Sequence, residues 1–242
     1  MRAPPKLRIS CNQKGLTLRE VVVLLFVVAA LLFVVIRGLK TTASKALQTK
    51  SFNKAKEIGF ACKAFGSDHE GQYPSYVFVN GTTTKTRISD YSNTAFDQLL
   101  PTYLQTIQPF HLATSAWTPT VMVDPTDATM QAGKSLPAGS NEWAYVAGLR
   151  DTSDPRFPLI ADGFADLHRH DYRTIETTRG GVWRGRSAIV VFADDSAQVI
   201  ECDPWTHRVP GSPNGRDLFD TSGQAGWMSS TGTNGQTVLN PE

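Results

Sequence analysis

The strongest pattern in the chain is an uninterrupted apolar run near its start, Val21 to Ile36. Together with residues 16–20, this run would reach about 31 Å as a helix, which matches the hydrocarbon core of a bilayer. A single spanning segment must satisfy its backbone donors internally, and a helix does so. The sequence therefore predicts a transmembrane helix over about 16–36.

Past this run the pattern becomes that of an amphipathic helix, with no proline before Pro74. One face is apolar at a helical spacing. Its residues are Ala55, Ile58, Cys62 and Phe65. Gly66-Ser67-Asp68 supplies a stop signal. We therefore expect one continuous helix over 16–66, half of it in lipid and half packed on a globular domain.

The rest of the chain, 67–242, has the short β-branched and aromatic runs that are typical of strands. These runs lie at 142–149, 158–161, 187–193 and 197–202. The last two flank Asp194-Asp195-Ser196 and predict a hairpin. A short helix is expected over 92–100, and the chain from Pro204 onward is loop-rich. The predicted fold class is α+β: a long N-terminal helix, half transmembrane, packed on a mostly antiparallel β-sheet domain.

Charge adds an orientation. The formal net charge is +2, and the first fifteen residues hold Arg2, Lys6, Arg8 and Lys14 but no acid. The positive-inside rule places this basic leader in the cytoplasm and the C-terminal domain on the outer side. The remainder is close to neutral, which argues against nucleic-acid binding, because that function needs a concentrated basic face.

Two charged residues, Arg19 and Glu20, stand at the mouth of the apolar run. An ionisable group at membrane depth costs roughly 2.5–3.5 kcal/mol and by default marks function. Cleavage after Gly15 would create a new α-amino group on Leu16 at the same depth. In a bundle of parallel helices, that amine could neutralise the Glu20 carboxylate of a neighbouring copy.

These residues also carry a family resemblance. Lys14-Gly15-Leu16-Thr17-Leu18-Arg19-Glu20 before an apolar run resembles the class III signal of type IV pilins and type II secretion pseudopilins. The resemblance implies that a prepilin peptidase cuts after Gly15 and methylates Leu16, and that Glu20 is the family's assembly glutamate. Leu16 stands where phenylalanine is usual, and Arg19 is an uncommon neighbour. The implied partners are the peptidase, other pseudopilin subunits, an assembly platform and the inner membrane.

The resemblance continues beyond the leader. Two blocks, 55–61 and 68–74, are similar to the N-x-K-Q-I-G-x-A and D-x-x-G-x-Y-P segments of pseudopilin-like proteins of planctomycetes and verrucomicrobia. Three further stretches look like segments of verrucomicrobial members: 143–149, 158–163 and 180–191. The implied organisation is a leader at 1–15, the helix at 16–66 and a pilin-like periplasmic domain at 67–242.

Two groups of residues are candidate metal ligands. His168 and His170, with Asp162, Asp166 and Asp171 nearby, lack the spacing of a second ligand pair, so a solvated loop is the favoured interpretation. The resemblance to major pseudopilins suggests a C-terminal calcium loop. Its candidates here are Asp203, Asp217 and Asp220, but the ligand pattern of a calcium loop is not reproduced. We therefore predict no metal ligand and no cofactor, and keep bound calcium as an alternative.

Cysteine usage leaves one alternative open. Cys11 would leave with the leader, and Cys62 and Cys202 would remain in an oxidising compartment as a candidate disulfide or as two buried thiols.

No nucleophile elbow, phosphate loop, CxxC or paired-carboxylate motif occurs, so we expect no enzyme activity. The sequence favours a pseudopilin that assembles into a periplasmic filament. A type IV pilin subunit and a bitopic, membrane-anchored binding domain remain as alternatives.

Overall fold

The computed structural model describes residues 17–78, 85–88, 90–112, 115–118, 135–213, 215, 217–231 and 235–242, with the backbone alone at 34–43, 78 and 85. The chain divides into two units, Met1–Gln48 and Thr49–Glu242, and each is considered by itself. The helices are α1 Leu18–Asp68, α2 Ser92–Phe96, and the 3-10 turns η1 Asp97–Leu99, η2 Gln108–Phe110 and η4 Gln224–Gly226. The strands are β1 Tyr76–Phe78, β2 Lys85–Arg87, β3 Trp143–Ala147, β4 Pro158–Asp162, β5 Ser187–Phe192, β6 Ala197–Glu201 and β7 Thr237–Leu239.

The larger sheet of the second unit has five antiparallel strands in the order β6-β5-β4-β3-β7, and β1 and β2 pair in a separate antiparallel sheet. β3 and β4 are buried at every residue, because both faces of the sheet centre are covered. β6 lies at an edge and is mostly accessible. The predicted α+β class with an antiparallel sheet is confirmed, and so are the four predicted strands.

The β5–β6 hairpin forms where it was predicted, and its turn has a non-glycine residue in the left-handed conformation. Asp195 stands in the left-handed region at φ 71°, a conformation that glycine adopts more easily. Its amide donates to the Phe192 carbonyl at 2.9 Å, and the Ser196 amide donates to Asp194 Oδ1 at 2.9 Å. The aspartate pair thus builds a turn without glycine.

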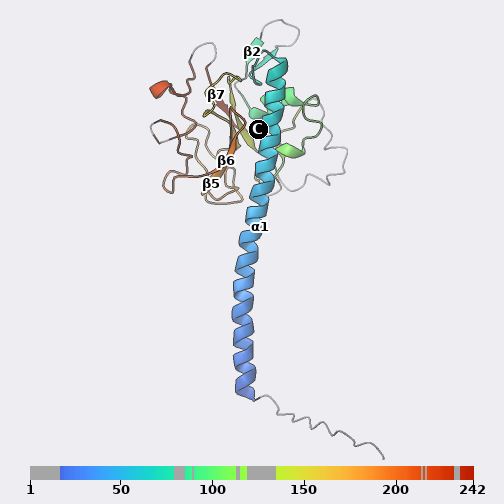
Figure 1. Ribbon diagram of the computed structural model, residues 1–242, viewed down its shortest axis with the longest axis vertical. Coiled ribbons are helices and arrows are strands. Elements are labelled where there is room, and N and C mark those ends of the chain that lie inside the picture. Colours follow the sequence, from blue (N-terminus) through green and yellow to red (C-terminus); the bar gives the residue numbers. More distant parts are fainter. Residues whose placement is uncertain are drawn as a thin grey trace, which may run out of the picture. The chain divides into compact units, whose positions relative to one another are not determined.

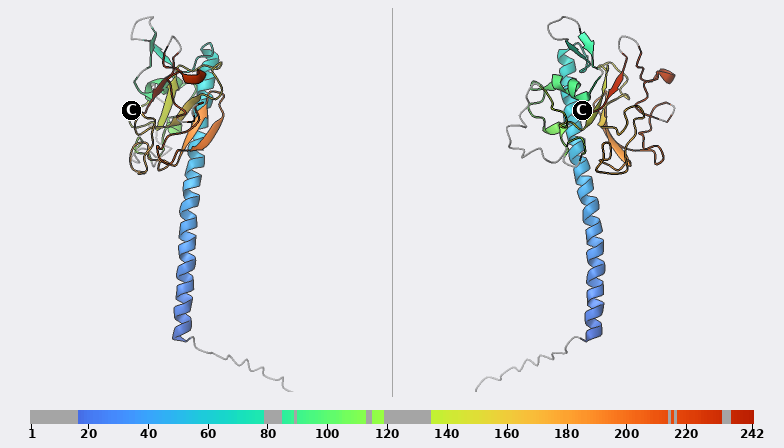
Figure 2. Two further views of the ribbon diagram at one scale, coloured as in Figure 1. Left: turned by 90° about the vertical axis from the view of Figure 1, so that its left-hand side faces the viewer. Right: turned by 180° about the vertical axis from the view of Figure 1, so that it is seen from behind.

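The part of α1 that belongs to the second unit packs on this sheet, beside β5 and β6 (Figures 1 and 2). The predicted apolar face is buried in the core: Ala55, Ile58, Cys62 and Phe65. Gly59 allows the close approach, because a Cβ there would lie 2.7 Å from Asp195 Oδ1 and 2.9 Å from Val191 Cγ1.

α1 ends at Asp68, as the stop signal predicted. The amides of His69 and Gly71 donate to the Gly66 carbonyl at 3.0 and 2.8 Å, which satisfies the helix end. Gly71 has φ 77°, and a Cβ there would overlap the Asp151 carboxylate. Only glycine fits this exit turn without strain.

The predicted helix over 92–100 is present as α2 followed by η1. Its N-cap is Tyr91, which makes no side-chain cap bond, whereas Ser92 Oγ donates to the Trp143 carbonyl at 2.7 Å. Tertiary contact with β3 therefore takes the hydroxyl that would otherwise cap the helix. β7, which pairs with β3, was missed because it lies in the loop-rich C-terminal stretch.

Candidate assembly site

The α1 N-terminus carries Glu20, the residue that the sequence singles out. The Glu20 amide donates to Thr17 Oγ1 at 3.4 Å. In return Glu20 Oε2 accepts from the Thr17 amide at 2.7 Å and from Thr17 Oγ1 at 2.9 Å. This is a capping box, in which the residue before the helix and the residue three places on satisfy each other's backbone groups. The T-x-x-E spacing of Thr17 and Glu20 predicts a capping box, and our sequence interpretation did not include it.

Only one carboxylate oxygen of Glu20 is used in this box. Oε1 has no hydrogen bond within the part of the chain that the structure describes, and the side chain is exposed. Within a single copy, therefore, Glu20 caps its own helix and keeps an acceptor atom facing outward.

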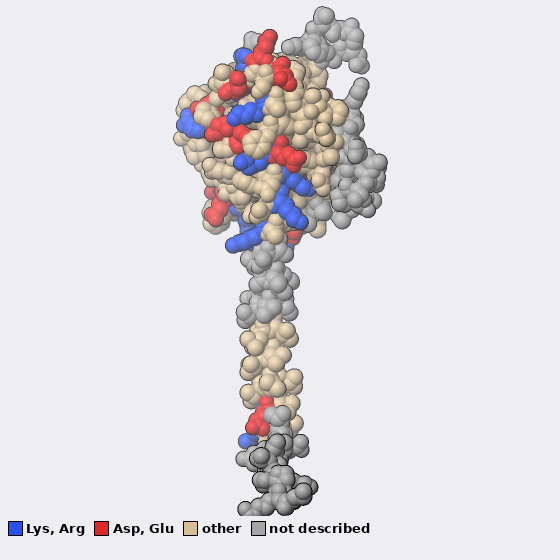
Figure 3. All heavy atoms as spheres, turned by 45° about the vertical axis from the view of Figure 1, so that its right-hand side comes forward, with Lys and Arg blue, Asp and Glu red and all other residues tan. Residues whose placement is uncertain are grey.

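The helix that follows is apolar on all sides. Every side chain over 17–33 is exposed, and the charged ones are Arg19 and Glu20, near the start of the stretch (Figure 3). A helix that is apolar around its whole circumference is stable only when something covers it. Among the described residues, no helix combines the length and the apolar character needed to cross a membrane.

Gly15 and Leu16, the predicted processing residues, lie outside the described residues. The remaining candidates all fall in the second unit, where their surroundings can be described.

Asp162, at the end of β4, is the centre of a buried polar cluster. Its Oδ2 accepts from Trp183 Nε1 at 2.9 Å and from the Ile189 amide at 2.7 Å. Its Oδ1 has no partner in the described structure. Burial raises the pKa of Asp162 to about 7, although its hydrogen bonds act in the opposite direction. Asp162 is therefore a buried acid of the sheet rather than a loop ligand.

Glu142, just before β3, is the second buried acid. It is fully buried, and neither carboxyl oxygen is hydrogen-bonded among the described residues. Burial raises its pKa well above the ordinary range, and the charge of Asp162 raises it further, against the effect of Lys54. Lys54 Nζ instead donates to the His111 carbonyl at 2.6 Å. Since neither acid reaches solvent, the pair suits a structural role better than catalysis.

The residues around His168 are engaged with one another in ion pairs. Arg169 bridges Asp166 at 3.2 Å and Asp171 at 2.8 Å. His170 Nδ1 lies 2.8 Å from Asp217 Oδ2, which ties this loop to the C-terminal one. Over the described ranges, no three His, Cys, Asp or Glu side chains gather to hold a metal ion.

The C-terminal aspartates are used as turn caps. Asp217 Oδ1 accepts from the Phe219 amide and Asp220 Oδ1 from the Ser222 amide, each at 2.9 Å. Asp203 caps the turn that follows β6. Each carboxylate thus caps its own turn, and Asp217 also pairs with His170.

Cys62 and Cys202 are both free and buried. Gly59, one turn before Cys62, lies against Asp195 in the β5–β6 turn, whereas Cys202 follows the far end of β6. A five-residue strand separates these ends by roughly 17 Å, far beyond the span of a disulfide. The candidate bridge is not present in this structure.

Comparison with models of known protein families finds no match to this chain, and neither do comparisons with curated proteins and with solved structures.

Proposed function

We propose that the chain is a pseudopilin: a subunit stored in the inner membrane by its N-terminal helix and assembled into a periplasmic filament of a type II secretion-like system. The pilin-like arrangement, a long and half-transmembrane helix followed by a periplasmic domain, is part of this proposal. So are its partners, namely a prepilin peptidase, further pseudopilin subunits and an assembly platform.

One observation carries the proposal: among the described residues, one carboxylate oxygen of Glu20 has no hydrogen bond, and it lies at the start of an exposed, wholly apolar helical surface. An exposed apolar surface of this kind favours a lipid or helical environment, and a carboxylate at its edge requires a positive partner there. The leader motif ending at Gly15 would provide this partner, since cleavage exposes the Leu16 amine.

The mechanism follows from these positions. Before assembly, Glu20 Oε2 closes the helix N-terminus through Thr17. During assembly, the Leu16 ammonium of one copy pairs with Glu20 of its neighbour, which sets the register between the helices. The apolar residues 21–36 then form the bundle core, and the second unit forms the outer surface of the filament.

Two substitutions at Glu20 test this mechanism, because they separate the charge from the helix cap. Glu20→Gln keeps an acceptor that closes the capping box, but it removes the negative charge. Glu20→Ala removes both. We expect both variants to insert into the membrane and neither to enter filaments with wild-type subunits, measured by co-purification of tagged copies. Arg19→Gln is the matched control and should assemble.

Normal incorporation of Glu20→Gln would contradict the pairing mechanism and leave the cap as the role of Glu20. Failure of the Arg19→Gln control would show that assembly responds to any charge change at this depth.

A further inference from the structure

Trp205 is the most exposed large hydrophobic side chain among the described residues, at 89%. It stands on a tight turn after β6 that hydrogen bonds hold rigid. Asp203 Oδ1 accepts from the amides of Trp205 at 3.0 Å and Thr206 at 2.7 Å, and the His207 amide donates to the Asp203 carbonyl at 2.8 Å. A side chain on such a preorganised turn loses little conformational entropy on docking.

Two positive charges that form no ion pair among the described residues border this turn. The His207 carbonyl accepts from the Tyr172 amide at 3.0 Å, and the His207 ring nitrogen Nδ1 lies 3.1 Å from the Gly185 carbonyl oxygen. The turn therefore packs against 172–173 and 185–186. Arg173 and Arg186 are exposed there, and neither forms an ion pair within the described ranges.

A complementary surface lies at the C-terminal end of α1. An open cleft of about 740 Å³ is lined there by aromatic rings and two carboxylates. Phe65 and His69 stack at 3.8 Å between centroids, and Tyr103 meets Phe65 edge-on at 5.6 Å. Asp68 accepts from Tyr103 Oη at 2.8 Å, and Glu70 has no ion pair in the described structure. The cleft thus offers aromatic rings and two carboxylates, with the Arg150 guanidinium donating to the Glu70 carbonyl at 3.2 Å. The Trp205 turn offers an aromatic ring beside two arginines, and its Asp203 carboxylate is engaged by the turn amides.

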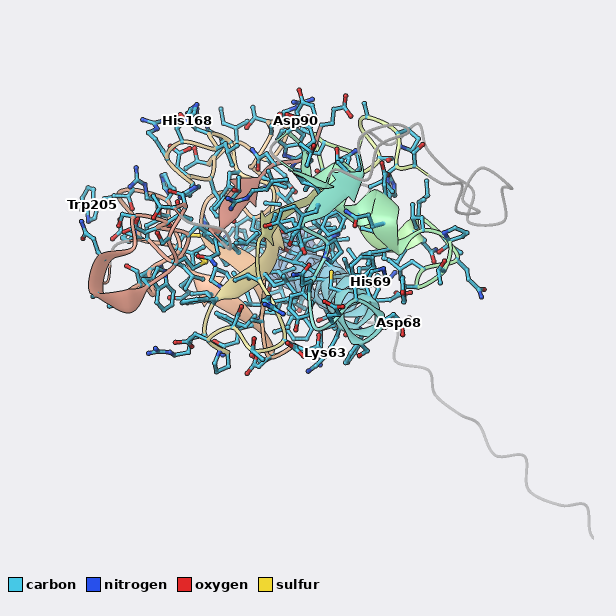
Figure 4. The ribbon with its side chains drawn as sticks, turned by 90° about the horizontal axis from the view of Figure 1, so that it is seen from above. Lys63, Asp68, His69, Asp90, His168 and Trp205 are labelled. Atoms are coloured by element: carbon cyan, nitrogen blue, oxygen red, sulfur yellow. The ribbon has the colours of Figure 1, made fainter. Side chains whose placement is uncertain are left out.

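We propose that Trp205 of one copy docks into this cleft of a second copy, with Arg173 and Arg186 facing Asp68 and Glu70. Trp205 projects on one side of the second unit, whereas Asp68 and His69 lie on the other side (Figure 4). A contact between surfaces on opposite sides continues from copy to copy, either into a closed ring or, where the rotation does not close, into an open filament. The inference rests on the proposed assembly function and assigns its contact outside the membrane.

Photo-cross-linking in membranes tests the contact with the full chain. Trp205 is replaced by p-benzoylphenylalanine, the cells are irradiated, and the cross-linked peptides are mapped by mass spectrometry. We expect an intermolecular product that joins position 205 to the segments 65–77 or 98–104. The same replacement at Tyr91, another exposed aromatic residue, is the matched control and should not label the cleft.

Charge reversal tests the ionic part. A cross-linker carried at position 205 should give a product at least about tenfold weaker in Arg173→Glu/Arg186→Glu, and likewise in Asp68→Lys/Glu70→Lys. Combining the two pairs should restore it. Absence of an intermolecular product, a product outside the cleft, or no restoration would each overturn the proposal.

The failure of this contact and the failure of the proposed function remain distinguishable. The cross-link is scored in membranes whether or not filaments form, while filament entry is scored separately through Glu20→Gln. Filaments without the cross-link would refute the docking contact alone, and an unprocessed N-terminus would refute the pseudopilin assignment.

Discussion

Replacement of Asp162 by asparagine should change how the stability of the protein depends on pH. The side chain accepts two hydrogen bonds through Oδ2, from Trp183 and Ile189, and an amide oxygen can accept both. The other oxygen has no partner among the described residues, so an amide nitrogen there loses no contact. The substitution thus removes the titration while it keeps the hydrogen bonds.

The sign follows from proton binding. Burial raises the pKa of Asp162 to about 7 in the folded chain, from an ordinary value of 3.8. Between these two values the folded state binds the extra proton, so the free energy of unfolding falls as pH rises. From pH 5 to pH 8 this linkage amounts to roughly 2.5 kcal/mol. Wild type should therefore lose about that much relative to Asp162→Asn, or roughly 5–10 °C in Tm.

The assay is thermal unfolding of the detergent-extracted full chain, followed by tryptophan fluorescence at pH 5, 6, 7 and 8. Comparing the two proteins at each pH cancels the titrating groups that do not interact with Asp162, such as His111, whose pKa burial lowers. Asp203→Asn is the control: turn hydrogen bonds hold the pKa of that exposed carboxyl below its usual range, so its difference from wild type should stay constant with pH. A constant Asp162→Asn difference, or one that shrinks as pH rises, would refute the reasoning.

Three further predictions concern the second unit. Gly71→Ala should lower the free energy of unfolding by roughly 2 kcal/mol, more than Gly215→Ala does. Both positions have positive φ, but only a Cβ at position 71 would also overlap Asp151. Equal losses of Tm in the two variants would contradict this. Asp195→Gly should raise Tm by roughly 2–4 °C, since glycine adopts the φ of 71° without strain; a lower Tm would count against it. Cys62 and Cys202 should resist a thiol reagent at pH 8 until the chain is denatured. Both thiols are buried, and burial raises the pKa of Cys202 to about 12 and the pKa of Cys62 further. Rapid labelling of the native protein would argue against this burial.

The sequence predicted those elements whose local pattern agrees with their tertiary surroundings. The face containing Ala55 and Ile58 repeats at helical spacing and is buried, and the β5–β6 hairpin joins two apolar, β-branched runs. β7 escaped prediction because a three-residue edge strand depends on its partner β3 rather than on its own pattern. The role of the Ser92 hydroxyl depends on distant residues in the same way, since it donates to the Trp143 carbonyl instead of capping α2.

The candidate site was only partly predictable. Glu20 stands out in the sequence because a charge interrupts an apolar run, but its bond to Thr17 needed the T-x-x-E spacing to be recognised. Glu142 and Asp162 carry no local signal, because their burial depends on strands that are distant in sequence coming together. Nor does the sequence around Trp205 indicate that this aromatic side chain is exposed, because its exposure depends on the turn that carries it.

The N-terminus of the membrane-extracted protein tests the central claim most directly. Intact-mass and N-terminal peptide mass spectrometry would determine where the mature chain begins. The pseudopilin account predicts a chain that begins at a methylated Leu16, with residues 1–15 removed. A chain that retains Met1 and the uncut Gly15–Leu16 bond in a host with an active prepilin peptidase would contradict it.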